Sequence, residues 1–192
     1  MEDKRIVKTR KNLKDTMIAL LQELPFEKIT VAELCRRGQT SRITFYTYYE
    51  DKYALVEEMF TDYLREAGED YHRLQAGNNP EKDGRIGYEN LLACILNLYY
   101  NNLPFFSRTT PETNPYLFSV FFNHIFASVD SYLRRHTRPV PNYSTREIAA
   151  LLCNGFGGVI SICHAERLSR EEVCRRVGAM YQDILESGLF RQ

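Results

Sequence analysis

Helix-start signals recur along this chain and constrain its fold more than any other feature. At three expected helix starts, Ser or Thr stands three residues before Glu: Thr30–Glu33, Ser144–Glu147 and Ser169–Glu172. In such a capping box the hydroxyl and the carboxylate satisfy free main-chain amides in the first turn of a helix. No segment alternates apolar and polar residues over a length typical of a strand. The sequence therefore predicts an all-α protein of about nine helices.

The N-terminal segment is predicted to hold one long helix followed by two short ones. Apolar residues recur at helical spacing before Pro25, which ends the first helix: Leu13, Met17, Leu20, Leu21 and Leu24. The second helix runs from the capping box at Thr30 to about Arg37, and the third from about Ser41 to Tyr48. Asp51 is placed to cap a fourth, whose apolar stripe is Leu55, Val56, Met59, Phe60, Tyr63 and Leu64.

The remaining pattern is also helical. A loop at 77–80 precedes a helix over about 86–101, and Phe105-Phe106 opens a short helix after Pro104. Asn114-Pro115 fits an N-cap followed by proline at the first helical position. The last two helices are expected over about 145–165 and 170–188, each opened by a capping box.

Charge is unevenly distributed along the 192 residues. The chain has 25 basic and 25 acidic side chains and no net charge. Residues 1–48, however, contain ten basic and six acidic side chains, an excess of four positive charges. A basic head on an acidic body indicates two functions in one chain. We expect two domains, over 1–50 and 51–192.

The sequence also predicts where the protein is located. We expect no transmembrane helix, because no stretch approaches about 18 uncharged apolar residues. The charged N-terminus does not resemble a signal peptide. Five cysteines, an odd number, are scattered without export signals, which favours reduced thiols in a cytoplasm: Cys35, Cys94, Cys153, Cys163 and Cys174. The expected location is cytoplasmic, with no membrane partner.

Three helices with a tight turn between the second and third form the layout of a helix-turn-helix DNA-binding motif. The third helix suits a major groove, because Arg42 can bind guanine or a phosphate. Thr44, Thr47 and the tyrosine hydroxyls can donate to phosphates or base edges. Lys52 begins the next helix, where the positive end of the helix dipole adds to its charge.

At these residues the sequence resembles the TetR (tetracycline-repressor) family of transcriptional regulators. The resemblance implies a helix-turn-helix DNA-binding domain over 1–50 and a helical effector-binding and dimerisation domain over 51–192. The most specific segments are 26–31 and 41–55, within a match from about Leu13 to Val56. The resemblance implies that Tyr46 and Lys52 contact phosphates and that the other third-helix residues lie where base and backbone contacts cluster. The expected DNA-binding residues are Thr30, Ser41, Arg42, Thr44, Tyr46, Thr47, Tyr48 and Lys52.

One position departs from the family pattern. The family's turn glycine corresponds to position 39, where this chain has Gln39, with Gly38 one step earlier. Glycine enters the left-handed region freely, whereas Gln there costs on the order of 1 kcal/mol. The sequence therefore leaves open the alternative that the turn is shifted by one residue.

Taken singly, the residues expected to bind DNA also allow a purely structural interpretation. Phe45 and Tyr49 are spaced as core aromatics, and the same could hold for Tyr46 and Tyr48. The basic cluster at positions 8, 10, 11 and 14 could be a solvated helix face. The ordered combination of caps, turn and third helix is what favours DNA binding.

A protein that recognises a palindromic site in this way is expected to be a homodimer. The last two helices carry apolar stripes, and 154–158 places small residues where helices could approach closely. The family pairs these helices into an intermolecular four-helix bundle. The interface residues expected here are Phe156, Val159, Ile160, Val173, Val177, Met180 and Ile184. The alternative is that the two helices close a core within one chain.

The middle of the chain, residues 53–135, is rich in aromatic residues. The family binds small effectors among these helices, so the resemblance implies an apolar or aromatic effector of unknown identity. The pocket candidates are Tyr63, Tyr99, Phe118, Phe122, His124 and Phe126. A stripe of aromatic residues is also typical of an ordinary hydrophobic core. The function expected is a repressor controlled by a small molecule, the alternatives being control by a protein partner or transcriptional activation.

Other function classes have weaker signals. Cys163-His164 places a thiol beside an imidazole, but helix neighbours point about 100° apart. The run 155–158 lacks the preceding strand and the following Lys-Ser/Thr of a phosphate loop. The cysteines and histidines show no CxxC or HxxxH spacing. We expect no enzyme, no cofactor and no metal site. A protein-interaction module with a vestigial head is the remaining rival.

Overall fold

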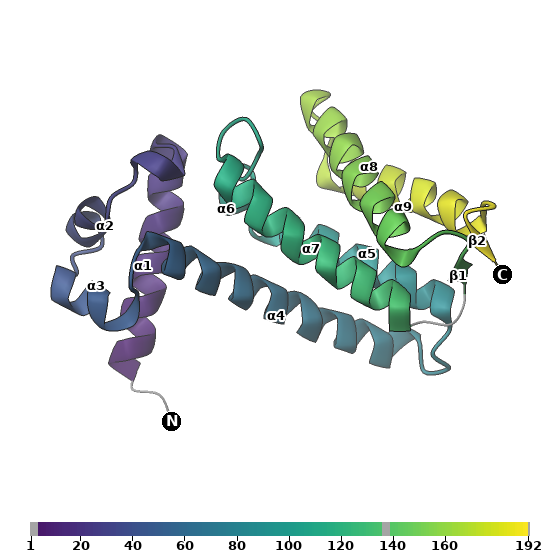
Figure 1. The fold of residues 1–192 in the computed structure, drawn as a ribbon, viewed down its shortest axis with the longest axis horizontal. Helices are drawn as coiled ribbons and strands as arrows, with labels where there is room; N and C mark the ends of the chain where they lie inside the picture. Colours follow the sequence, from purple (N-terminus) through teal and green to yellow (C-terminus); the bar gives the residue numbers. More distant parts are fainter. Residues whose placement is uncertain (1–3, 136–138, 192) are drawn as a thin grey trace. The chain divides into compact units, whose positions relative to one another are not determined.

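The computed structural model describes residues 4–135 and 139–191. Within these ranges the chain forms nine α-helices, one 3-10 helix and a two-residue antiparallel ladder (Figure 1). The N-terminal elements are α1 (Lys4–Glu23), η1 (Phe26–Lys28), α2 (Val31–Arg37), α3 (Arg42–Tyr48) and α4 (Lys52–Asn78). The later elements are α5 (Gly84–Asn101), α6 (Leu103–Phe106), α7 (Pro115–Arg135), β1 (Val140–Pro141), α8 (Thr145–Ala165), α9 (Arg170–Glu186) and β2 (Phe190–Arg191). The all-α prediction is confirmed.

Internal contacts divide the described chain into two compact units. Unit 1 contains residues 4–65 and 102–119, and unit 2 contains 66–101, 120–135 and 139–191. Both boundaries with the long helices fall inside α4 and α7, so neither helix belongs to one unit alone. The functional boundary near residue 50 remains a prediction.

The core of unit 1 forms around α1. Leu13, Met17, Leu20 and Leu21 are buried as the spacing predicts, whereas Leu24 is partly exposed because the helix ends at Glu23. Ion pairs join α1 to α4: Arg10 pairs with Glu58, and Lys14 pairs with both Glu58 and Asp62. Together these contacts fix α1 against the first turns of α4.

The segment 102–119 belongs to unit 1 although it lies far along the sequence. Asn114 is buried, and its side-chain oxygen accepts a hydrogen bond from the amide of Phe26 at 2.6 Å. Its side-chain nitrogen donates to the carbonyl of Arg108, also at 2.6 Å. The ring of Tyr116 stacks on Phe26 with centroids 5.5 Å apart. The Asn114 side chain is therefore a tertiary link to η1, while Pro115 occupies the first position of α7 as predicted.

The three predicted capping boxes form to different extents. At Ser144 both halves are present, because Glu147 also accepts from the Ser144 amide at 3.0 Å. At Thr30 and Ser169 the hydroxyl accepts from the third amide, but the glutamate side chain is bound by two arginines instead. Arginines three and four residues later outcompete the main-chain amide for the carboxylate at those two helix starts.

Unit 2 packs α5, α8 and α9 around buried aromatic and branched residues. Tyr88, Val173, Val177, Tyr181 and Leu185 are almost wholly buried. A buried glycine is required on α5, because a Cβ at Gly87 would lie 2.2 Å from the hydroxyl of Tyr132. That hydroxyl accepts a hydrogen bond from Tyr71 at 3.2 Å.

The composition of α8 contradicts the expectation that the chain has no long uncharged, apolar stretch. Residues 148–165 carry no charged side chain, so the expectation that no such stretch exists was wrong. By length and composition, with a mean hydropathy of 1.7, α8 is the one described helix that could span a membrane. Of the 18-residue apolar stretch of α8 with this hydropathy, only 28% is buried in the structure. Much of the apolar surface of α8 is therefore exposed in the described structure.

Candidate nucleic-acid interface

The turn between α2 and α3 keeps the register of the resemblance. Gln39 has φ of 47° and so occupies the left-handed region, whereas Gly38 has φ of −78°. The turn is therefore not shifted by one residue. Gly38 is needed for another reason: a Cβ there would lie 3.0 Å from the carbonyl oxygen of Leu34 and 3.1 Å from Oγ1 of Thr16. The glycine permits close packing against α1, and Gln39 accepts the strained conformation.

The helix α3 has one buried and one exposed face. Phe45 and Tyr49 are buried, which confirms their prediction as core aromatics. Tyr46 is 56% exposed, and its ring packs edge-on against Phe45 with centroids 5.5 Å apart. The other exposed residues of the segment are Ser41, Arg42, Ile43 and Thr47. Thr44 and Tyr48 lie between the two faces.

Most hydroxyl groups expected at the interface also bond within the chain. Ser41 Oγ accepts from the Thr44 amide at 3.0 Å and contacts the Thr44 hydroxyl at 2.8 Å. Thr47 Oγ1 donates to the carbonyl of Ile43 at 2.9 Å. Thr30 Oγ1 accepts from the Glu33 amide at 3.2 Å. These hydroxyls hold the ends and turns of α2 and α3, which positions the exposed face.

Arg42 is the available cation of α3. It is exposed and makes no hydrogen bond or ion pair to any other residue that the structure describes. The hydroxyl of Tyr46 is likewise without a hydrogen-bond partner across the described ranges. A guanidinium and a phenol on one helix face are donors suited to phosphates and base edges.

Lys52 has a different environment from the one expected. Its ammonium donates to three main-chain carbonyls: Phe26 at 2.7 Å, Ile29 at 2.9 Å and Glu27 at 3.1 Å. It also lies 4.5 Å from the centre of the Phe26 ring. Burial lowers the pKa of Lys52 below its ordinary value, against the opposing effect of Glu27 and Asp51. With all three ammonium hydrogens used, Lys52 ties the start of α4 to η1.

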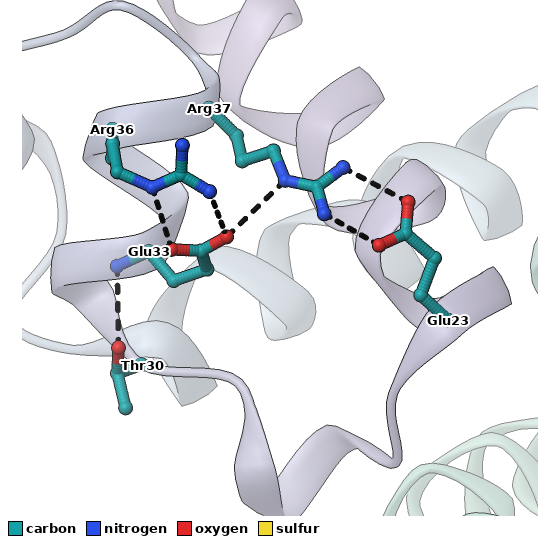
Figure 2. Close-up of polar contacts among 5 residues, drawn as sticks. All are labelled: Glu23, Thr30, Glu33, Arg36 and Arg37. Carbon is teal, nitrogen blue, oxygen red and sulfur yellow. Dashed lines mark hydrogen bonds and ion pairs between the residues drawn. The ribbon is translucent and has the colours of Figure 1, made fainter.

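A cluster of ion pairs joins α2 to the end of α1 (Figure 2). Glu33 binds Arg36, with Nε 2.9 Å from Oε2, and also binds Arg37, whose guanidinium binds Glu23 at the end of α1. Hydrogen bonds from Arg36 and then Arg37 lower the pKa of Glu33 to about 2. The cluster consumes two of the ten basic side chains of the head and braces α2 against α1.

Solved structures share the fold of this chain over nearly its whole length. A putative TetR-family transcriptional regulator from Syntrophomonas wolfei superposes with a TM-score of 0.77 at 12% identity, covering 95% of this chain and 97% of that one. A TetR transcriptional regulator from Streptococcus agalactiae gives a TM-score of 0.58 at 22% identity, covering 93% and 96%. Reduced NemR from E. coli gives 0.59 at 17% identity, covering 96% and 98%. The chain has the TetR-family fold.

Sequence comparison gives a shorter match. An uncharacterized HTH-type transcriptional regulator from Bacillus subtilis, YxbF, is 34% identical over 50 residues, which are 26% of this chain. The match spans 13% of that relative's length. No protein-family model matches the chain. The TetR-family fold therefore rests on the full-length structural likeness and the N-terminal motif together.

In this TetR-family fold the predicted interface residues divide into two groups. Phe156, Val173 and Val177 are buried within unit 2, where Phe156 packs on Tyr181 with ring centroids 5.4 Å apart. They form the core beneath the surface of α8 and α9. The remaining four are partly or well exposed: Val159, Ile160, Met180 and Ile184.

Sequence reasoning identified the small residues of 154–158 as a place of close helix approach but did not identify the exposed stripe that two of them form with Leu151 and Ile162. Leu151 and Ile162 are 50% and 61% exposed, and Gly155 and Gly158 lie between them on the same helix face. A Cβ at either glycine would meet nothing within 4 Å. Spacings of four, three and four residues, the ordinary signal of one helix face, could have identified this α8 stripe.

The predicted pocket residues are divided between the two units. In unit 1, Tyr63 packs on Phe105 and Phe106, and Phe118 belongs to the same unit. In unit 2, Phe122 stacks on Phe126 at 6.2 Å, and His124 lies on the same helix. The effector site therefore stays a prediction.

Tyr99 lies in a separate contact that sequence reasoning did not anticipate. Its hydroxyl is 3.3 Å from Nδ1 of His164, whose Nε2 is 3.1 Å from the hydroxyl of Tyr100. The His164 imidazole, near the end of α8, therefore lies between two tyrosines near the end of α5. Among the residues the structure describes, no group of three metal-ligating side chains comes together.

Proposed function

We propose that this chain is a transcriptional regulator of the TetR type that binds double-stranded DNA through α3. The observation that carries the proposal is the exposure of Arg42 and Tyr46, one turn apart on α3, while Phe45 and Tyr49 of the same segment are buried. The buried side chains fix the orientation of the helix, and the exposed donors suit a major groove.

The regulator acts as a homodimer on a two-fold symmetric operator, with half-sites about 34–36 Å apart or a multiple of that spacing. The α8 stripe of Leu151, Gly155, Gly158 and Ile162 supports this arrangement, because its apolar surface is open within one chain. The two glycines allow close approach of a second α8. The protein works in the cytoplasm, and the apolar surface of α8 is covered by a second copy, not by a membrane.

We assign the regulator a repressor role under the control of a small apolar or aromatic effector bound within residues 53–135. The aromatic pairs in that region, such as Phe122 on Phe126, support an apolar ligand. Such control requires that the effector bind the DNA-competent and DNA-incompetent states with different affinity.

Selection of bound fragments from random duplex DNA, with the full chain as bait, tests the proposal. A two-fold symmetric consensus is the expected result, and it would establish DNA recognition and the dimer together. A well-folded sample that retains no duplex at low ionic strength would overturn the proposal and favour a protein-interaction module. An asymmetric consensus would retain DNA binding and remove the dimer.

A further inference from the structure

Ile43 has the largest exposed fraction of the large apolar side chains in the described ranges, at 84%. It lies in the first turn of α3. A β-branched residue loses rotamer freedom in a helix, and its apolar surface here remains in water. A single exposed apolar residue is common on protein surfaces, so its position and neighbours decide what it means.

The neighbours of Ile43 combine apolar surface with one cation. Tyr46 and Thr47 lie one turn after Ile43 on α3 and are exposed like it, and the exposed Arg42 directly precedes it. Thr47 donates its hydroxyl hydrogen to the carbonyl of Ile43, so it offers a partner a methyl group and lone pairs but no donor. The available donors on this face come from Arg42 and Tyr46.

This combination matches a particular pattern in the major groove. Thymine presents a C5 methyl group there, and guanine presents the N7 and O6 acceptors. We infer that Ile43 is a specificity-determining residue that packs on a thymine methyl group beside the base or phosphate contacted by Arg42. The inference rests on the proposed DNA-binding function and adds the base that the apolar part of α3 selects.

Removing single methyl groups from the DNA tests this role. In duplexes of the selected consensus, each thymidine is replaced in turn by 2′-deoxyuridine, which keeps base pairing and loses only the C5 methyl. At one position in each half-site we expect affinity to fall about fourfold per methyl, the effect of burying one methylene-sized group. Ile43→Ala should show no further fall at that position, and Ile43→Val should retain part of it.

Two controls separate recognition from folding. Ile43 is exposed, so Ile43→Ala should melt at the wild-type temperature or slightly above. Leu103→Ala removes another exposed apolar side chain of unit 1, on α6, and should leave the deoxyuridine effect unchanged.

The outcomes distinguish this inference from the proposed function. A consensus that tolerates every deoxyuridine replacement would overturn the role of Ile43 and leave DNA binding intact. The role of Ile43 is also overturned if Ile43→Ala loses affinity on deoxyuridine DNA as strongly as the wild type does. Failure to select any DNA would overturn both.

Discussion

The ammonium of Lys52 donates a hydrogen bond to the carbonyl of Phe26 at 2.7 Å, which ties the first residue of α4 to η1. The carbonyls of Ile29 and Glu27 accept its other two hydrogens. Lys52 therefore links the helix that leads away from the head to the segment that precedes α2. This role is structural, whereas the family resemblance implies a phosphate contact.

Lys52→Met should lower the free energy of unfolding by about 2 kcal/mol, because it removes charged hydrogen bonds and leaves carbonyls without their donor. Thermal or urea unfolding measures the loss. Under conditions where the variant is folded, the slope of log affinity against log salt should equal that of the wild type. A slope reduced by about one would instead identify Lys52 as a phosphate contact.

The turn residues should respond in opposite directions. Gln39→Gly should raise the free energy of unfolding by about 1 kcal/mol, because glycine adopts the left-handed region without strain. Gly38→Ala should lower it by about 1–3 kcal/mol, since the new Cβ crowds Leu34 and Thr16. Urea unfolding of the two variants checks both signs. Stabilisation by Gly38→Ala would contradict the described packing.

Acid should weaken unit 1 partly through Glu33. Its pKa is lowered from 4.5 to about 2 in the folded chain, chiefly by its hydrogen bonds to Arg36 and then Arg37. Between these two values the unfolded chain binds a proton that the folded chain does not, so stability falls as pH falls. Glu33→Gln should therefore melt below the wild type at pH 7.

The difference between Glu33→Gln and the wild type should shrink as pH drops from 4.5 toward 2, where both states of the wild type become protonated. Melting temperatures across this pH range provide the measurement. Glu112→Gln is the control, because Glu112 is an exposed carboxylate of unit 1 without an ion pair in the described chain. Equal pH profiles for both variants would exclude the Glu33 contribution.

Arg42→Ala should weaken binding to the selected operator by about 1–3 kcal/mol if the guanidinium contacts a base. Fluorescence anisotropy with operator and scrambled duplexes measures the change and its sequence dependence. Arg175→Ala is the matched control, since it removes the same charge from an exposed position in unit 2. Equal losses for the two variants would show a general charge effect.

Leu151→Asp and Ile162→Asp should convert the proposed dimer into monomers. Each places a charge in the α8 stripe, and two-fold symmetry applies every substitution twice. Loss of two buried apolar side chains should raise the dimer dissociation constant about a hundredfold or more. Analytical ultracentrifugation measures it. Tyr143→Asp, at an exposed aromatic outside the stripe, should leave the association state as it was.

Local signals in the sequence predicted the elements well, because caps and apolar spacing act over a few residues. Phe45 and Tyr49 were identified as core from their spacing alone. The capping carboxylates of Glu33 and Glu172 were mispredicted, because nearby arginines compete for them. Which partner wins depends on side-chain geometry that a motif does not contain.

Tertiary relationships were harder to predict. Asn114 fits a local N-cap in sequence, yet its side chain bonds Phe26, 88 residues away. Val173 and Val177 share an apolar stripe with Met180, and only burial in the fold shows that the valines face inward. Ile43 has no sequence signal of its own, since its meaning comes from being exposed beside Arg42.

The bond between Asn114 and Phe26 limits how this protein can be dissected. A fragment truncated after residue 65 would leave the Phe26 amide without its acceptor and its ring without Tyr116. Hybrid regulators made by exchanging N-terminal segments would therefore need to carry 102–119 along with the transplanted head. Two stretches that are separated in the sequence must therefore be kept together for unit 1 to fold.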